Sequence, residues 1–211
     1  MAAAAAALAD RIPAELAPLA RVAYNYRWAW ADDGPAVFAD IDADRWARVG
    51  GNPVRLLSET DLRTLEAAGA RPDLVARAEA LADLVDGDLA RPPAEGLPAD
   101  RPVAFLCAEF AVHASLPIYS GGLGVLAGDI LKEASDLALP MVAVGLMYRT
   151  GYFHQRLDTR GYQHEFWLDS DPERLPCVPL TGEDGAPPSV AVPVDDEDVV
   201  ARVWRADVGR V

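Results

Sequence analysis

The chain has 211 residues, of which 51% are hydrophobic and 25% are charged, and its formal net charge is −14. A chain of this size can bury one sizeable core or two small ones. Its 33 acidic against 19 basic residues argue against a nucleic-acid partner, because phosphate backbones require concentrated Lys and Arg. A small phosphorylated ligand stays compatible with this charge, since a few local donors suffice to bind it.

The sequence also argues against a membrane anchor and a metal site. It contains no run of about 20 apolar residues, the length that a membrane-spanning helix needs, and the N-terminal Ala-rich run follows no basic region. The two cysteines, Cys107 and Cys177, match no metal-binding or redox spacing. We therefore expect a soluble, cytoplasmic protein with reduced thiols, without a metal and without a membrane partner.

Residues 1–85 are predicted to form a helical unit. Apolar residues at three- and four-residue spacing predict a helix over 14–31, starting near Pro18, where proline is tolerated. Aromatic residues at 24, 26, 28 and 30 could stack on sugars, although at helical spacing they more often belong to a core. Short helices joined by turns follow over 32–59, and two more helical stretches over 59–85, broken near residue 70.

A change of character marks a domain boundary. Residues 86–101 are rich in Pro, Gly and charge and are predicted to be a linker. The runs 103–110, "VAFLCAEF", and 141–148, "MVAVGLMY", are typical of strands buried on both faces. Between them an apolar face predicts a helix over 123–138, formed by Leu123, Leu126, Ile130, Leu131, Ala134 and Leu137. Strand, helix and strand predict a right-handed βαβ unit, which starts a doubly wound α/β domain over 102–211.

The C-terminal part is predicted to be β-structure. Residues 151–167 suggest a hairpin with Gly161 near its tip, and residues 189–194 and 199–211 alternate as two strands separated by an acidic turn. The last strand runs into Val211 without a turn or a closing helix. We therefore expect the α/β domain to be incomplete at its C-terminal end.

The stretch "LPIYSGGLGVLAGDILKEASDLALP", residues 116–140, places Gly121, Gly122 and Gly124 directly against a helix. A loop that leads from a parallel strand into a helix lies where α/β sheets bind ligands, and glycine lets an anion approach the free N–H groups there. The loop lacks the Gly-Lys-Ser/Thr of a Walker loop and does not match G-x-G-x-x-G. From the residues alone, a phosphate or sugar-phosphate site and an ordinary structural turn are equally open.

Residues 108–155, from "AEFAVH" through the glycine loop to "GYFHQ", resemble the signature region of bacterial α-glucan (glycogen/starch) phosphorylases. Residues 21–59 resemble the N-terminal helical extension of that bacterial branch. The resemblance implies the GT-B architecture of glycosyltransferase family 35, with the active site between two α/β domains. It implies transfer of terminal glucosyl units of an α-1,4-glucan to inorganic phosphate, giving glucose 1-phosphate, with pyridoxal phosphate as the cofactor.

The same resemblance assigns a role to the glycine loop. In the family this loop supplies backbone amides to the substrate phosphate and the glucosyl unit, and the matching positions here are Gly121, Gly122 and Leu123. Gly124 would then allow the turn into the helix. Such amides stabilise an anion beside an oxocarbenium-like centre because they are oriented before the reaction begins.

Other residues are candidates for supporting roles only. Glu109 and His113 belong to the signature, and for both of them loop-ordering hydrogen bonds and substrate contact remain open. Ser120 is expected to cap the helix. The lysine that carries pyridoxal phosphate lies far downstream in the family, and Lys132, the only lysine here, does not match it. We therefore expect no catalytic residue in this chain and no catalysis by the chain alone.

Two other functions are compatible with parts of the sequence. Glycogen or starch synthases also carry a Gly-Gly-Leu-Gly loop, but near the N-terminus and usually after a lysine, whereas Tyr119-Ser120 precede it here. A non-catalytic glucan-binding or interaction module is the alternative from another class. The aromatic-rich first helix permits it, and the unpaired edge of an incomplete sheet argues against it. For a complete enzyme, a homo-oligomer is compatible with the sequence.

Overall fold

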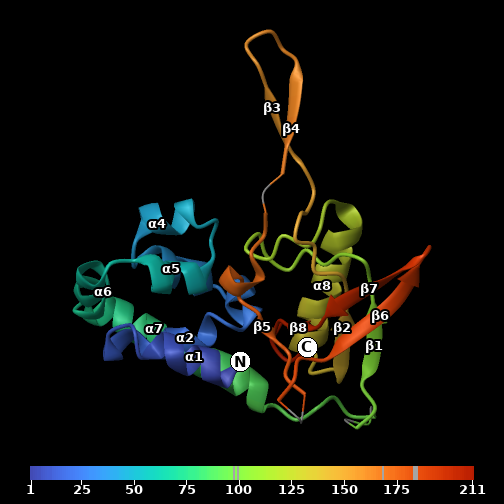
Figure 1. Cartoon of the computed structure of the whole chain (residues 1–211). Coiled ribbons are helices and arrows are strands. Elements are labelled where there is room, and N and C mark those ends of the chain that lie inside the picture. The colour runs from blue at the N-terminus through green and yellow to red at the C-terminus, as the bar shows by residue number, and fades with distance from the viewer. Residues whose placement is uncertain (97, 99, 168, 183–184) are drawn as a thin grey trace.

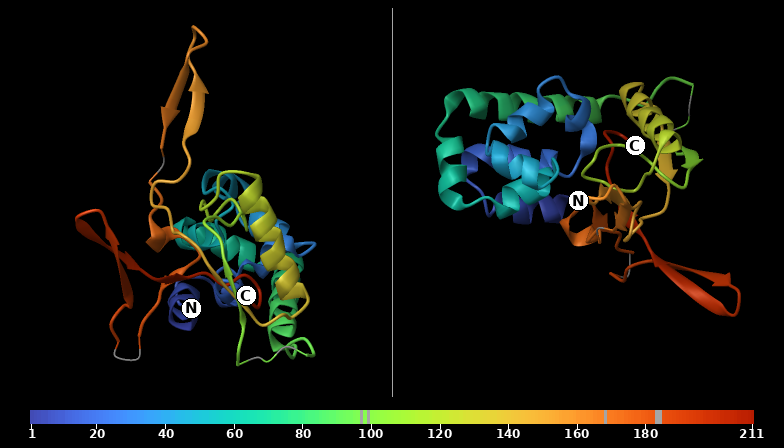
Figure 2. Two further views of the ribbon diagram at one scale, coloured as in Figure 1. Left: turned by 90° about the vertical axis from the view of Figure 1, so that its right-hand side faces the viewer. Right: turned by 90° about the horizontal axis from the view of Figure 1, so that it is seen from above.

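The computed structural model describes residues 1–96, 98, 100–167, 169–182 and 185–211. Helices gather on one side of the molecule, the α/β elements lie on the other, and two β-hairpins project from the body (Figures 1 and 2). The N-terminal part comprises α1 (Ala2–Ala9), η1 (Ala14–Leu16), α2 (Ala17–Val22), η2 (Tyr26–Trp30), α3 (Gly34–Ala39), α4 (Ala43–Arg48), α5 (Pro53–Glu59), α6 (Leu62–Gly69) and α7 (Pro72–Ala90).

Several helix starts follow directly from the sequence. The side chains of Asp42, Asn52 and Asp61 precede α4, α5 and α6, and each accepts a hydrogen bond from the backbone N–H three residues on, at 2.8–3.0 Å. Proline occupies the first turn of α2, α3, α5 and α7, where its missing N–H removes no helical bond. The two helices expected over 59–85 are confirmed as α6 and α7.

The stretch 14–31 is not one helix, as its periodicity predicted, but η1, α2 and η2 in succession. Pro18 lies in the first turn of α2, as expected. The interruption is at Asn25, which is buried and extended. Its side chain caps η2 by accepting the Arg27 N–H at 2.9 Å, and it exchanges two 2.9 Å hydrogen bonds with the backbone of Gly209. A partner 184 residues away thus stabilises the break, which local periodicity could not reveal.

The segment predicted to be a linker begins inside a helix. Helix α7 continues to Ala90, so residues 86–90 are helical. Residues 97 and 99 of the same segment lie outside the described residues. On the far side of the segment, the chain enters β1 at Val103.

The predicted strand–helix–strand unit is confirmed. Strands β1 (Val103–Leu106) and β2 (Met141–Val144) pair in parallel, with α8 (Gly122–Asp136) as the crossover. Burial on both faces is not confirmed, since Leu106 is 73% exposed and Val142 is 52% exposed. One face of this pair, with Phe105, Met141 and Ala143, packs on the core, whereas the described residues place no layer over the other face, which carries Leu106, Val142 and Val144.

Helix α8 buries a different face from the one predicted. Leu131 and Ala134 are buried as expected, but the other four members of the predicted face are exposed: Leu123, Leu126, Ile130 and Leu137. The buried face consists mainly of small residues, including Gly124, Ala127 and Gly128. A Cβ at Gly128 would lie 2.2 Å from the carbonyl oxygen of Ala111, so the helix backbone packs directly on the chain after β1.

The C-terminal part forms paired strands. The hairpin β3 (His154–Leu157) and β4 (Gln163–Phe166) is confirmed, with Gly161 at φ +83° in its turn. Strands β6 (Ser189–Val194) and β7 (Glu197–Arg202) form the second hairpin, and β5 (Val178–Pro179) pairs with β8 (Trp204–Arg205). Between β4 and β5 lies the short η3 (Pro172–Arg174).

The prediction that the last strand runs to Val211 is wrong. After β8 the chain leaves the sheets, and residues 207–211 pack against the helical part (Figure 1). The N–H of Tyr26 donates to the Asp207 carbonyl at 2.8 Å, and the N–H of Arg210 donates to the Ser135 hydroxyl at 3.1 Å. These hydrogen bonds hold the segment in a turn between the start of η2 and α8.

One continuous hydrophobic core joins the helical part to the α/β part. Tyr26 and Trp28 are fully buried, and the Trp28 ring packs edge-to-face on Phe38 and Trp46 at 5.3 and 5.8 Å. Residues after β1, among them Phe110, belong to the same core. The central aromatic residues of the stretch 14–31 are therefore core, and they form no exposed platform for sugars.

A polar network at the C-terminal end of α8 adds to this junction. Trp30 Nε1 donates to both carboxylate oxygens of Asp136 at 3.1 Å. Arg27 donates to Asp88 at 2.5 Å and lies 3.8 Å from Asp136. Arg91 donates to the carbonyl oxygens of residues 135 and 136 at 3.2 and 2.9 Å, at the end of the helix, where the last carbonyls have no partner in a following turn.

Candidate functional site

A pocket of about 400 Å³ lies at the carboxyl ends of β1 and β2, beside the glycine loop. The chain after β1 contributes Glu109, and the chain after β2 contributes Tyr148 and Tyr152. The glycine loop contributes Ser120 and Leu123. Open α/β sheets bind ligands at this position, outside the carboxyl ends of their strands. The predicted loop therefore borders a cavity large enough for a sugar-sized molecule.

The glycine loop leads into α8 with two glycines that have open space around them. Gly121 is the N-cap residue, with extended dihedral angles of −155° and −154°, and Gly122 is the first helical residue. A Cβ at either position would meet no atom within 4 Å. These glycines are not required by packing, so their small size leaves the helix terminus accessible from outside.

Two groups of backbone N–H can be distinguished at this terminus. We call those of Ser120, Gly121 and Gly124 the inner amides: the Ser120 N–H donates to the Glu109 carboxylate, and those of Gly121 and Gly124 face the same carboxylate and contribute to its lowered pKa. We call those of Gly122 and Leu123 the outer amides; within the described residues neither has a hydrogen-bond partner. Of the three amides that the resemblance assigned to substrate, the structure places Gly121 on the inner side.

Gly124 lies in the first turn of α8, inside the helix predicted over 123–138. Its lack of a side chain is required by packing, because a Cβ would lie 2.7 Å from the Cβ of Tyr119 and 3.3 Å from the carboxylate of Glu109. Its carbonyl accepts the N–H of Ala111 at 2.8 Å. Gly124 therefore brings the helix against the chain after β1.

Glu109 makes loop-ordering hydrogen bonds, one of the two roles open for it. Its Oε2 accepts the backbone N–H of Ser120 at 2.5 Å and the Ser120 hydroxyl at 3.1 Å. The Ser120 N–H is the largest cause of the lowered pKa of this carboxyl group. Ser120 is not the helix cap that we predicted, because its hydroxyl donates to Glu109 and the N-cap position falls to Gly121.

His113 faces the helical part and is not among the residues that line the pocket. Its ring lies 4.7 Å from that of Trp28 and 6.4 Å from that of Tyr26. Nδ1 accepts the N–H of Ser115 at 3.2 Å, so the neutral ring carries its proton on Nε2. Burial, and secondly the charge of Lys132, lower the pKa of His113. The geometry gives His113 a role in holding the helical part against the loop.

Lys132 lies on α8, where its Nζ is 3.7 Å from the carboxylate of Asp129. It does not line the pocket. Among the described residues, no three His, Cys, Asp or Glu side chains are grouped so as to hold a metal ion. The helices that the structure describes include none that is long and apolar enough to cross a membrane.

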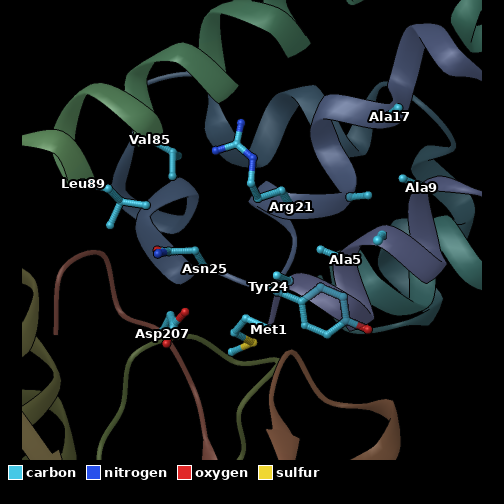
Figure 3. Close-up of a pocket in the computed structure, with 13 residues that line it drawn as sticks. Met1, Ala5, Ala9, Ala17, Arg21, Tyr24, Asn25, Val85, Leu89 and Asp207 are labelled. Carbon is cyan, nitrogen blue, oxygen red and sulfur yellow. The ribbon is translucent and has the colours of Figure 1, made fainter.

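A second pocket, of about 420 Å³, lies away from the glycine loop, between α1, α2, α7 and Asp207 (Figure 3). Its walls are mostly alanine and other apolar side chains. Arg21 is paired with Asp86, and the amide of Asn25 is engaged with Gly209. Two of its polar residues are therefore already satisfied within the protein, and we assign no ligand to it.

Comparison with known proteins adds the following relationships. The family that matches residues 12–116 is described as a protein of unknown function (DUF3417). The chain is 38% identical over 207 residues to the maltodextrin phosphorylase of Thermococcus litoralis, covering 96% of this chain and 25% of that protein. It is 40% identical over 212 residues to the glycogen phosphorylase of Mycobacterium tuberculosis, covering 95% and 24%. For the glycogen phosphorylase of Aquifex aeolicus the identity is 35% over 189 residues, covering 90% and 27%. The chain thus spans about a quarter of the length of these relatives.

Proposed function

Because this chain belongs to the α-glucan phosphorylases, as an N-terminal portion, we propose that it forms one wall of the active site of such an enzyme. The complete protein would transfer terminal glucosyl units of an α-1,4-glucan to inorganic phosphate, giving glucose 1-phosphate. The proposal includes the GT-B architecture, in which a second α/β domain closes the other side of the cleft. The observation that supports it most is the pair of unpartnered outer amides beside a pocket at the carboxyl ends of two parallel strands.

The outer amides of Gly122 and Leu123 would bind the anionic group of the substrate. They lie at the N-terminus of a 15-residue helix, where the helix dipole favours negative charge. Because they are fixed in the backbone, they need no reorganisation when charge develops during the reaction. Tyr148 and Tyr152 would limit the access of water to the reacting atoms.

Pyridoxal phosphate is the cofactor that the family implies, and its chemistry is proton transfer through its own phosphate group. Lys132 does not fit the attachment of this cofactor, because it is paired with Asp129 on α8 and lies off the pocket lining. We propose that the cofactor lysine belongs to another part of the complete enzyme, and we derive no step of the reaction through the cofactor. By itself this chain would bind substrate groups without turning them over.

The test uses the polypeptide that the gene encodes, including whatever follows Val211. It is incubated with maltodextrin and inorganic phosphate, and glucose 1-phosphate is measured. We expect activity in the natural protein and a loss of roughly 100-fold or more in Gly122→Val, since its side chain would take the place of the anion. Gly87→Val is the matched control, because Gly87 is an exposed helical glycine that also has open space around it.

Each outcome of this assay bears on the proposal. Full activity in Gly122→Val would remove the proposed role of the loop. Transfer from ADP-glucose or UDP-glucose, without phosphorolysis, would favour the synthase instead. The absence of both activities, with glucan still bound, would favour a binding module.

A further inference from the structure

The carboxylate of Glu109 occupies the inner side of the helix terminus whose outer side we assign to substrate. Its Oε2 lies 2.5 Å from the Ser120 nitrogen and 3.1 Å from the Ser120 hydroxyl. Charge-assisted hydrogen bonds of this kind are about twice as strong as neutral ones. A carboxylate also interacts favourably with the positive end of the α8 dipole. Glu109 thus satisfies the Ser120 N–H, and faces the other inner amides, with a group of the same charge as the substrate anion.

The backbone around Glu109 leaves this carboxylate little freedom. Two residues on, the N–H of Ala111 donates to the carbonyl of Gly124, and the carbonyl of Ala111 touches Gly128. The strand end and the first two turns of α8 are therefore docked backbone to backbone. The Glu109 side chain spans the remaining distance to Ser120, ahead of the helix.

We propose that Glu109 is a positioning residue of the phosphorolytic site: by accepting the N–H and hydroxyl of Ser120 and packing against Gly124, it fixes the loop so that the outer amides of Gly122 and Leu123 remain free for the substrate anion. This assignment rests on the proposed function. It also predicts that the site is selective among anions, because an anion that enters meets only the two outer N–H groups and not the whole helix terminus. Without the carboxylate, the inner amides would be unpaired and the loop could rotate to expose them.

The first experiment does not depend on activity. Hydrogen–deuterium exchange of peptides covering residues 117–126 is followed by mass spectrometry in the complete polypeptide. We expect exchange at residues 120, 121 and 124 to become about tenfold faster or more in Glu109→Ala. Glu109→Gln, which keeps an acceptor oxygen but loses the charge, should give a smaller increase. Glu133→Gln, the same change at an exposed position of α8, should have no effect.

The second experiment separates positioning from general damage. For Glu109→Gln we expect the KM for inorganic phosphate to rise severalfold while the KM for maltodextrin changes less than about twofold. Equal changes in both constants, or unchanged exchange at the inner amides in both Glu109 variants, would overturn the assignment. If Glu109→Ala does not fold, the exchange of Glu109→Gln decides alone. If no variant and no natural protein shows phosphorolysis, the proposed function fails, whereas the exchange data still decide whether Glu109 orders the loop.

Discussion

Trp30 donates its indole N–H to both carboxylate oxygens of Asp136, at 3.1 Å each, across 106 residues of sequence. The bond joins the last turn of η2 to the C-terminal end of α8, which is the helix that starts at the glycine loop. Arg27 lies over the Trp30 ring at 5.0 Å and close to the same carboxylate. The helical part therefore holds the far end of the helix whose near end borders the pocket.

Breaking the Trp30–Asp136 hydrogen bond should destabilise the junction between the helical part and α8 and leave the hydrophobic core packed. In Trp30→Phe a smaller phenyl ring replaces the indole and the donor is lost, and a hydrogen bond to a charged group contributes about 1.5–3 kcal/mol when well enclosed. Asp136 is partly exposed, so we expect the free energy of unfolding to fall by about 1 kcal/mol. Denaturant titration measures it, with Asp129→Asn on the exposed side of α8 as the control. No change in midpoint would show that the bond contributes nothing.

Removing the aromatic side chain of Trp28 should lower the free energy of unfolding much more. Trp28 is fully buried between Phe38, Trp46 and His113, and large-to-small changes of a buried Trp cost about 3–5 kcal/mol. Trp28→Ala should therefore abolish the cooperative unfolding transition or lower its midpoint steeply. Trp167→Ala, at a 56% exposed tryptophan, should change stability by no more than about 0.5 kcal/mol. Similar effects of the two changes would contradict the core position of Trp28.

The packing of α8 predicts a difference between two of its glycines. Gly128→Ala places a methyl group where the Ala111 backbone lies, so the helix must move away and the protein should unfold more readily. Gly122→Ala adds the same atom in open space and should leave the melting temperature nearly unchanged. Differential scanning calorimetry of both variants tests this directly. A stable Gly128→Ala variant would show that α8 does not pack as described.

His113 predicts a loss of stability in mild acid. Its pKa in the folded protein lies below the ordinary value of 6.5, so the unfolded chain takes up the proton more readily. The folded protein therefore has its full stability with respect to His113 above pH 6.5. Part of this stability is lost as the pH falls toward the lowered pKa. The melting temperature should thus decline as the pH falls below about 6.5, before most carboxylates begin to titrate. His113→Gln should flatten this part of the profile, and an unchanged slope would exclude His113 as its origin.

Much of the fold was predictable because local signals carried it. Apolar periodicity and turn residues identified most of the helices, Pro18 located the start of α2, and the apolar runs around α8 identified the parallel strand pair. The face of α8 was predicted wrongly because periodicity counts leucines and overlooks glycine, although it is Gly128 that lets the helix approach Ala111. Likewise the break at Asn25 depends on Gly209, which no local window includes.

The site was predictable only in outline. The glycine loop and its signature located it, and Glu109 stood out as part of that signature. The sequence does not show which amides face the carboxylate and which face outward. That depends on how the loop docks on the chain after β1, which is a property of the tertiary structure. The tyrosines at 148 and 152 lie within the signature, but nothing in it placed them beside the loop, because they line the pocket only once β2 has paired with β1.

The contact between Asn25 and Gly209 has a consequence for the order in which the chain matures during synthesis. Asn25 leaves the ribosome early, with its hydrogen bond from Arg27 available and both of its bonds to Gly209 still to be made. Until residue 209 emerges, the side-chain NH2 of Asn25 lacks its protein acceptor, and the break between α2 and η2 lacks the two bonds that stabilise it. The N-terminal helices should therefore remain loose, and open to proteases and chaperones, until the segment 207–211 closes over them.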